Sequence, residues 1–187
     1  MPLTTKQSGF AMLEALITAL IVAIGVSGVG VLLLRSLQAT QDSSQQSQAM
    51  WIVQDFAGKL RANSSAARSG DYIGQTTVAD CANLPTMCAS FNINGLITSS
   101  VENCDSNVMA AYDSWTSVCG LDSDSFDTPS DFIANPNLNS LCEQRDTDNE
   151  CVRYNITLTW DTKLARGSDT ASERTNTNNY SMTVEVN

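Results

Sequence analysis

Glu14 is the residue whose position most needs a chemical explanation. It is the one charged residue between Phe10 and Leu34, in a run that is otherwise apolar or small. A carboxylate in a lipid-facing helix costs about 2.5–3.5 kcal/mol at the bilayer centre and less near the surface. Such an acid is expected to have a partner, and a nearby ammonium group lowers the cost of burying both charges. An acid merely tolerated at the membrane surface is the simpler alternative.

The cysteines are the second group of residues that could do chemistry. All six lie after the apolar run: Cys81, Cys88, Cys104, Cys119, Cys142 and Cys151. An even number on one side of a membrane segment indicates disulfides in an oxidising compartment. Zinc binding and free thiols are the alternatives, but the chain has no histidine and no C-x-x-C pair. Six cysteines allow 15 pairings. Pairing sequence neighbours predicts Cys81–Cys88, Cys104–Cys119 and Cys142–Cys151.

A short acidic run offers oxygen ligands for calcium. Asp146, Asp148 and Glu150 lie within five consecutive residues, and Asp122, Asp124 and Asp127 form a looser group. The run lacks the glycine and the full spacing of an EF-hand, so a solvated loop is favoured and no metal site is predicted. No cofactor motif is present. Without histidine, the usual nucleophile–base pairs are missing, so we do not expect an enzyme.

The apolar run itself predicts a membrane helix. Residues 10–34 would span about 37 Å as a helix, enough to cross a bilayer. The apolar core of a secretory signal is shorter and is followed by a cleavage site, so this segment is expected to remain in the mature chain. Lys6 and the amino terminus favour a cytoplasmic N-terminus, which the cysteines support by requiring an oxidising side. The globular part is therefore expected in the periplasm.

The helix is expected to continue beyond the membrane. Between Arg35 and Asn63 there is no proline, and an apolar stripe recurs at helical spacing. Its members are Ala49, Ile52, Val53, Phe56 and Leu60. The residues 38–48 before the stripe predict a solvated neck. Asn63-Ser64-Ser65 and then Ser69-Gly70 are expected to end the helix. Gly25, Gly28 and Gly30 allow either close helix packing or local melting.

The rest of the chain predicts an α+β domain. Asp105–Trp115 reads as a second helix, with Val108, Ala111, Tyr112 and Trp115 on its buried face. Residues 152–160 and 180–186 alternate apolar and polar side chains and predict two antiparallel strands joined by a polar loop, 162–178. A further strand is expected near Ser90–Ile97. The predicted fold is a long N-terminal helix packed on a small antiparallel sheet, with disulfide-stapled loops.

The N-terminus resembles the type IV prepilin signature. Lys6, Gly9, Phe10 and Glu14 stand where that family has a basic leader, its cleavage glycine, the first mature residue and the fifth, acidic one. The resemblance implies cleavage after Gly9 by prepilin peptidase, methylation of Phe10 and a role for Glu14 in assembly. The implied division is a leader (1–9), a transmembrane or filament-core helix (10–34), an amphipathic periplasmic half (35–65) and a globular pilin domain (66–187).

Weaker pieces resemble the PilV type of minor pilin, the type IV pilus modification proteins. These are the helix 35–63, Cys104 followed by Tyr112 and Trp115, and a late strand ending in Trp160. The resemblance implies a structural subunit that primes pilus assembly in the inner membrane and then enters the pilus. Its implied partners are other minor pilins, the major pilin and a large tip adhesin.

Two other functions fit the same N-terminus. One is a minor pseudopilin of type II secretion, and the other is a membrane-tethered periplasmic binding module. A nucleic-acid ligand is not expected, because 20 acidic residues outnumber 10 basic ones and give a formal charge of -10.

Overall fold

The computed structural model describes residues 10–93, 96–98, 104–120, 132–163 and 175–186. The chain divides into two compact units between Asp42 and Ser43. Helix α1 (Phe10–Ala62) contributes residues to both. Each unit is described by itself.

In the first unit, α1 is an uninterrupted apolar helix. Its large hydrophobic side chains from Met12 to Leu37 are all at least half exposed. The helix runs through Gly25, Gly28 and Gly30 without a break. It is the one described helix that is long and apolar enough to cross a membrane.

In the second unit, the C-terminal part of α1 forms one side of the core. Ala49, Val53, Phe56 and Leu60 are buried, and Ile52 is half-buried. The predicted apolar stripe is therefore confirmed. A short helix, α2 (Ser64–Ser69), follows, and Gly70 ends it in the left-handed conformation with a φ of 94°. The Gly70 N–H donates to the carbonyls of Ala66 and Ala67, which caps the helix as predicted.

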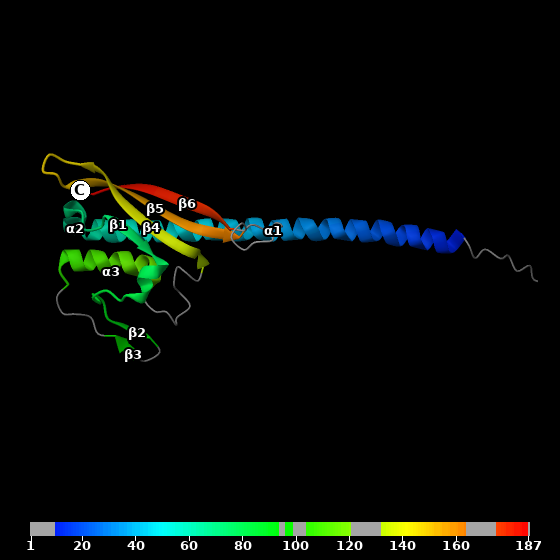
Figure 1. The fold of residues 1–187 in the computed structure, drawn as a ribbon, viewed down its shortest axis with the longest axis horizontal. Helices are drawn as coiled ribbons and strands as arrows, with labels where there is room; N and C mark the ends of the chain where they lie inside the picture. The colour runs from blue at the N-terminus through cyan, green and yellow to red at the C-terminus, as the bar shows by residue number, and fades with distance from the viewer. Residues whose placement is uncertain (1–9, 94–95, 99–103, 121–131, 164–174, 187) are drawn as a thin grey trace, which may run out of the picture. The chain divides into compact units, whose positions relative to one another are not determined.

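The other side of the core is a four-stranded antiparallel sheet, seen with α1 and α3 in Figure 1. Its strands, in spatial order, are β1 (Gly74–Thr77), β4 (Ala134–Arg145), β5 (Cys151–Lys163) and β6 (Thr175–Glu185). In the β5–β6 pair, Ile156 lies opposite Met182 and Leu158 opposite Tyr180. The two predicted C-terminal strands and their antiparallel pairing are confirmed. Both strands extend into the range predicted as a loop.

Strands β1 and β4 were not predicted. The inward positions of β4 are Pro136, Leu138 and Ser140, of which Leu138 alone is a large hydrophobic residue. Proline removes a ladder hydrogen bond and is normally confined to edges or bulges. Here the β4–β5 register shifts between Ala134 and Asn137, and the pairing with β1 ends at Asn137. Pro136 is thus accommodated at an irregularity.

The strand predicted near Ser90–Ile97 is instead a hairpin. Strands β2 (Phe91–Ile93) and β3 (Leu96–Thr98) pair antiparallel in a separate two-stranded sheet. The main sheet ends at β1 and β6, and these two short strands form a sheet of their own. The short 3-10 helix η1 (Val78–Ala82) lies between β1 and this hairpin.

Helix α3 (Ser106–Cys119) is longer than predicted, and its buried face is different. Ala110 and Tyr112 are buried, but Ala111 is exposed and Val108 and Trp115 are half-buried. The buried side continues instead through Asp113, Ser117 and Val118. The prediction of an apolar face missed this because two of the buried positions are polar.

The three disulfides correct the neighbour pairing. The structure joins Cys81 to Cys119, Cys88 to Cys104 and Cys142 to Cys151. Pairing Cys142 with Cys151 was right, whereas Cys81–Cys88 and Cys104–Cys119 were wrong. The reason is that η1 packs on α3, which places Cys81 beside the C-terminal end of α3.

Candidate functional site

Glu14 lies on the exposed surface of α1, four residues after the first residue of the helix, Phe10. Residues four apart lie on one face of a helix and about 6 Å apart along its axis. The side chains next to Glu14 are apolar and exposed, among them Leu13 and Ile17. Gly9 lies outside the described residues. The geometry thus places a carboxylate on an apolar surface close to the start of the helix.

A polar seam joins α1 to α3 in the globular unit. Lys59 Nζ lies 2.9 Å from Asp55 Oδ2 and donates to the hydroxyls of Thr116 (3.2 Å) and Ser117 (3.0 Å). Farther along, Asn63 Nδ2 donates to the Ser106 carbonyl at 2.7 Å. These contacts tie α1 and the residue that follows it to α3.

A buried carboxylate on α3, Asp113, bonds to a residue outside this seam. The hydroxyl of Tyr72 donates to Asp113 Oδ2 at 2.5 Å. Burial raises the pKa of Asp113, although the Tyr72 hydrogen bond and the Lys59 charge act in the opposite direction. Burial also raises the pKa of Tyr72, helped by its hydrogen bond to Asp113. The pair is structural, since each group satisfies the other.

The acidic run considered for calcium makes other contacts. Arg68 on α2 donates to Glu150 (2.5 Å) and Asp146 (3.1 Å). The other oxygen of Asp146 accepts the backbone N–H groups of Asp148 and Glu150. The carboxylates thus pin the β4–β5 turn to α2. Within the described ranges, no cluster of three or more His, Cys, Asp or Glu side chains could hold a metal. Asp122, Asp124 and Asp127 lie outside those ranges.

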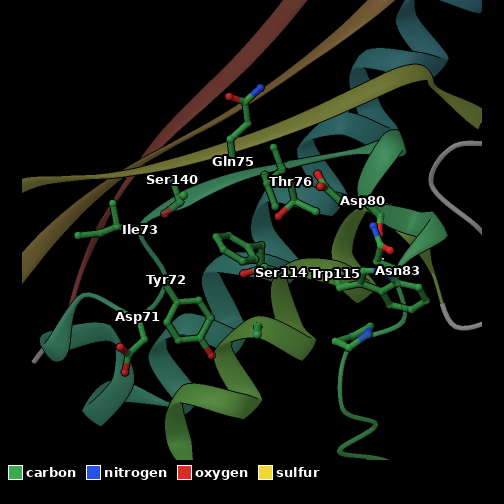
Figure 2. Close-up of a pocket in the computed structure, with 15 residues that line it drawn as sticks. Asp71, Tyr72, Ile73, Gln75, Thr76, Asp80, Asn83, Ser114, Trp115 and Ser140 are labelled. Carbon is green, nitrogen blue, oxygen red and sulfur yellow. Dashed lines mark hydrogen bonds between the residues drawn. The ribbon is translucent and has the colours of Figure 1, made fainter.

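A pocket of about 320 Å³ opens between α3 and the β1–β4 edge of the sheet (Figure 2). Phe56 and Leu138 supply apolar lining, and Trp115, Ser114 and Ser140 are among the other lining side chains. No sequence pattern predicted this pocket, because its lining comes from α1, β1, η1, α3, β4 and the segments between them. The same holds for the Tyr72–Asp113 pair, whose members are 41 residues apart.

Comparison with known proteins agrees with the architecture. Residues 31–115 match the family model of type IV pilin Tt1218. This part of the chain is similar to type IV pilins. The match runs from the end of the apolar segment of α1 to Trp115 on α3 and covers somewhat less than half of the chain. It does not include Gly9, Phe10 or Glu14. The chain matches no curated protein and no solved structure.

The fold class is the predicted one, a type IV pilin-like α+β fold. A long N-terminal helix, a small antiparallel sheet and three disulfides are all present. The pilin match supports a structural role and assembly with other pilins. The apolar part of α1 fits membrane anchoring before assembly.

Proposed function

We propose that this protein is a minor pilin of the PilV type, a structural component that helps to prime type IV pilus assembly. The observation that carries the proposal is the part of α1 from residue 12 to residue 34, an apolar helix surface with one exposed carboxylate, Glu14. Such a surface needs a covering of lipid or of other apolar helices. The pilin-like fold and the match over residues 31–115 support the pilus as the place where it is covered.

In this proposal the chain is cleaved after Gly9 and the new N-terminus at Phe10 is methylated. The globular domain then lies in the periplasm and later on the pilus surface. The three disulfides support this orientation, because such bonds persist in oxidising compartments.

Glu14 sets the register of assembly in the proposed mechanism. The amine at Phe10 of a neighbouring subunit pairs with the Glu14 carboxylate when the helix leaves the bilayer. In a low-dielectric helix bundle, this pairing offsets part of the cost of burying both charges. The other apolar side chains of α1 exchange lipid contacts for helix contacts, so no large hydrophobic penalty opposes the transfer.

The proposed partners are other minor pilins and the major pilin, with a large tip adhesin carried on the same complex. Prepilin peptidase acts earlier, at Gly9. The segments that resemble PilV-type minor pilins support this assignment, because they follow one another along the chain. They are the helix 35–63, Cys104 with Tyr112 and Trp115, and the late strand that ends in Trp160.

The test is the amount of protein in sheared pili. Glu14→Ala should lower incorporation at least about tenfold, because it leaves the partner ammonium unpaired. Membrane insertion and the disulfide-bonded fold should not change. Thr18→Ala is the matched control, since Thr18 is exposed on the same helix and its hydroxyl donates only to the Ala15 carbonyl. Wild-type levels of Glu14→Ala in sheared pili would contradict the proposal.

Deletion of the gene separates this function from its nearest rivals. A minor pilin predicts loss of surface pili and of twitching. Loss of exoprotein secretion with normal pili would instead indicate a type II secretion pseudopilin. Full function of the Glu14→Ala variant would favour a tethered binding module.

A further inference from the structure

The pocket beside α3 contains a buried hydroxyl with no partner. Ser140 is 2% exposed, lines the pocket, and its Oγ makes no hydrogen bond. Gln45 and Trp160 carry the other two buried side-chain polar atoms without partners in the described ranges, and neither lines this pocket. Leaving a buried polar group unpaired typically costs about 1–3 kcal/mol. The hydroxyl has almost no exposed surface, so a group that enters the pocket can bond to it only in direct contact with this wall.

Gly74 provides the room beside that hydroxyl. It lies directly opposite Ser140 in the β1–β4 pair, so a side chain at position 74 would project from the same face of the sheet. A Cβ added there would have no neighbouring atom within 4 Å. Thr76 and Leu138, which lie opposite each other in the same strand pair, also line the pocket. In Figure 2 the Gln75 side chain, which alternates with these positions, points away from the pocket.

The opposite side of the pocket carries an oriented aromatic side chain. The Trp115 indole N–H donates to the Asp80 carbonyl at 3.2 Å, which holds the ring in place. The disulfide between Cys81 and Cys119 links η1 to the last residue of α3 and so braces this side. Figure 2 shows Asn83 and Asp80 near Trp115, with Ser140 and Tyr72 on the other side. The lining is largely preformed, which lowers the entropy that binding must overcome.

The charges of the lining exclude several ligand classes. Asp71 and Asp80 line the pocket, and none of the described lining residues is basic. Hydrogen bonds from the Thr77 N–H and hydroxyl lower the pKa of Asp80, so its carboxylate stays ionised and repels anions. An ammonium group could form an ion pair with these two exposed carboxylates. Near Ser140 it would face an uncharged wall with Phe56 and Leu138, where an unpaired charge is costly.

We propose that this pocket binds a neutral sugar unit, such as a monosaccharide residue of a glycan. A sugar ring presents hydroxyl groups that can donate to carboxylates and bond to Ser140 and Asn83. Its C–H faces can pack on Trp115 and on the apolar lining. A pocket of about 320 Å³ lies at the small end of ligand sites, which suits one ring. This inference goes beyond the pilin function and does not depend on it.

The test uses the full chain in phospholipid nanodiscs, which contain no sugar headgroup. Saturation-transfer NMR would measure binding of neutral hexoses and N-acetylhexosamines at millimolar concentration. Gly74→Val should abolish binding by filling the pocket. Ser140→Ala should weaken it about fivefold to tenfold through loss of one hydrogen bond. Asn139→Ala is the matched control, because Asn139 is the neighbour of Ser140 and points to the opposite face of β4.

Protein stability distinguishes a ligand-binding hydroxyl from a tolerated one. Ser140→Ala should melt at the same temperature as the wild type or higher, since it removes an unpaired buried group, while its sugar binding falls. The proposal is overturned if no neutral sugar binds the wild type, or if folded Ser140→Ala binds as tightly as the wild type. Binding of methylammonium or sulfate at this pocket in place of sugars would also overturn it.

Discussion

Asp113 combines an ionisable group with a buried position. It is 8% exposed, and the groups that face it are the Tyr72 hydroxyl and, at longer range, the charges of Lys59 and Asp55. Burial is the largest influence on its pKa and raises it. A carboxyl whose pKa is higher in the folded state binds its proton more tightly there than in the unfolded chain.

The pH dependence of folding follows from that difference. The contribution of Asp113 to stability is fully present below its unfolded pKa of about 3.9 and is lost as pH rises through its folded pKa. Asp113→Asn keeps an acceptor for Tyr72 but does not ionise. Its free energy of unfolding should therefore rise relative to the wild type as pH increases above about 4. Urea denaturation at a series of pH values would measure this.

The control for that experiment is Asp105→Asn. Asp105 is exposed at the start of α3, and its side chain makes no capping hydrogen bond. The substitution removes one exposed carboxylate, and its free energy of unfolding over the same pH series gives the baseline for the Asp113 variant. A parallel curve for Asp113→Asn would show that Asp113 has no raised pKa in the folded protein.

The C-terminal part of α1 is the element on which the globular unit is built. Leu60 is fully buried in the core that α1 shares with the sheet, whereas Trp51 on the same helix is 76% exposed. Leu60→Ala should lower the free energy of unfolding by about 2–5 kcal/mol, because it removes buried apolar volume. Trp51→Ala should change it by no more than about 0.5 kcal/mol. Chemical denaturation would measure the free energy of unfolding of both variants. Equal losses would contradict the assignment of Leu60 to the face of α1 that packs on the sheet.

The elements that could be predicted are those that carry their own pattern. The stripe on α1 and the alternation in β5 and β6 have large apolar side chains at most of their buried positions, so periodicity identifies them. Strand β4 has Pro136 and Ser140 at buried positions, and β1 is only four residues long. These strands are specified by their neighbours in the sheet, which a local pattern does not contain.

The disulfides act on the molecule as a whole. Cys81–Cys119 closes a separation of 38 residues, whereas Cys142–Cys151 closes one of 9 between paired strands. Replacing Cys81 and Cys119 by serine should lower the free energy of unfolding by about 2–5 kcal/mol. The same change at Cys142 and Cys151 should cost about 1 kcal/mol less, because a shorter loop restricts the unfolded chain less. Denaturation of both double variants would test this order, and the reverse order would contradict it.

A site could be predicted from the sequence where its residues lie close together along the chain. Gly9, Phe10 and Glu14 lie within six residues, so their predicted roles could be stated from the sequence. The Tyr72–Asp113 pair and the pocket around Ser140 combine side chains from distant segments. The wrong disulfide pairs have the same cause, since proximity in the fold decided the pairing and proximity in sequence did not.

The nested disulfides make resistance to proteases uneven along the chain. Cys88–Cys104 lies inside the span closed by Cys81–Cys119, and Cys142–Cys151 stands apart. A single peptide cut between residues 81 and 119 therefore leaves both fragments covalently joined. A cut between residues 120 and 141 separates α1 and α3 from β4, β5 and β6, with only non-covalent contacts left to hold them. A protease cut in that interval should therefore destabilise the molecule more than a cut between residues 81 and 119.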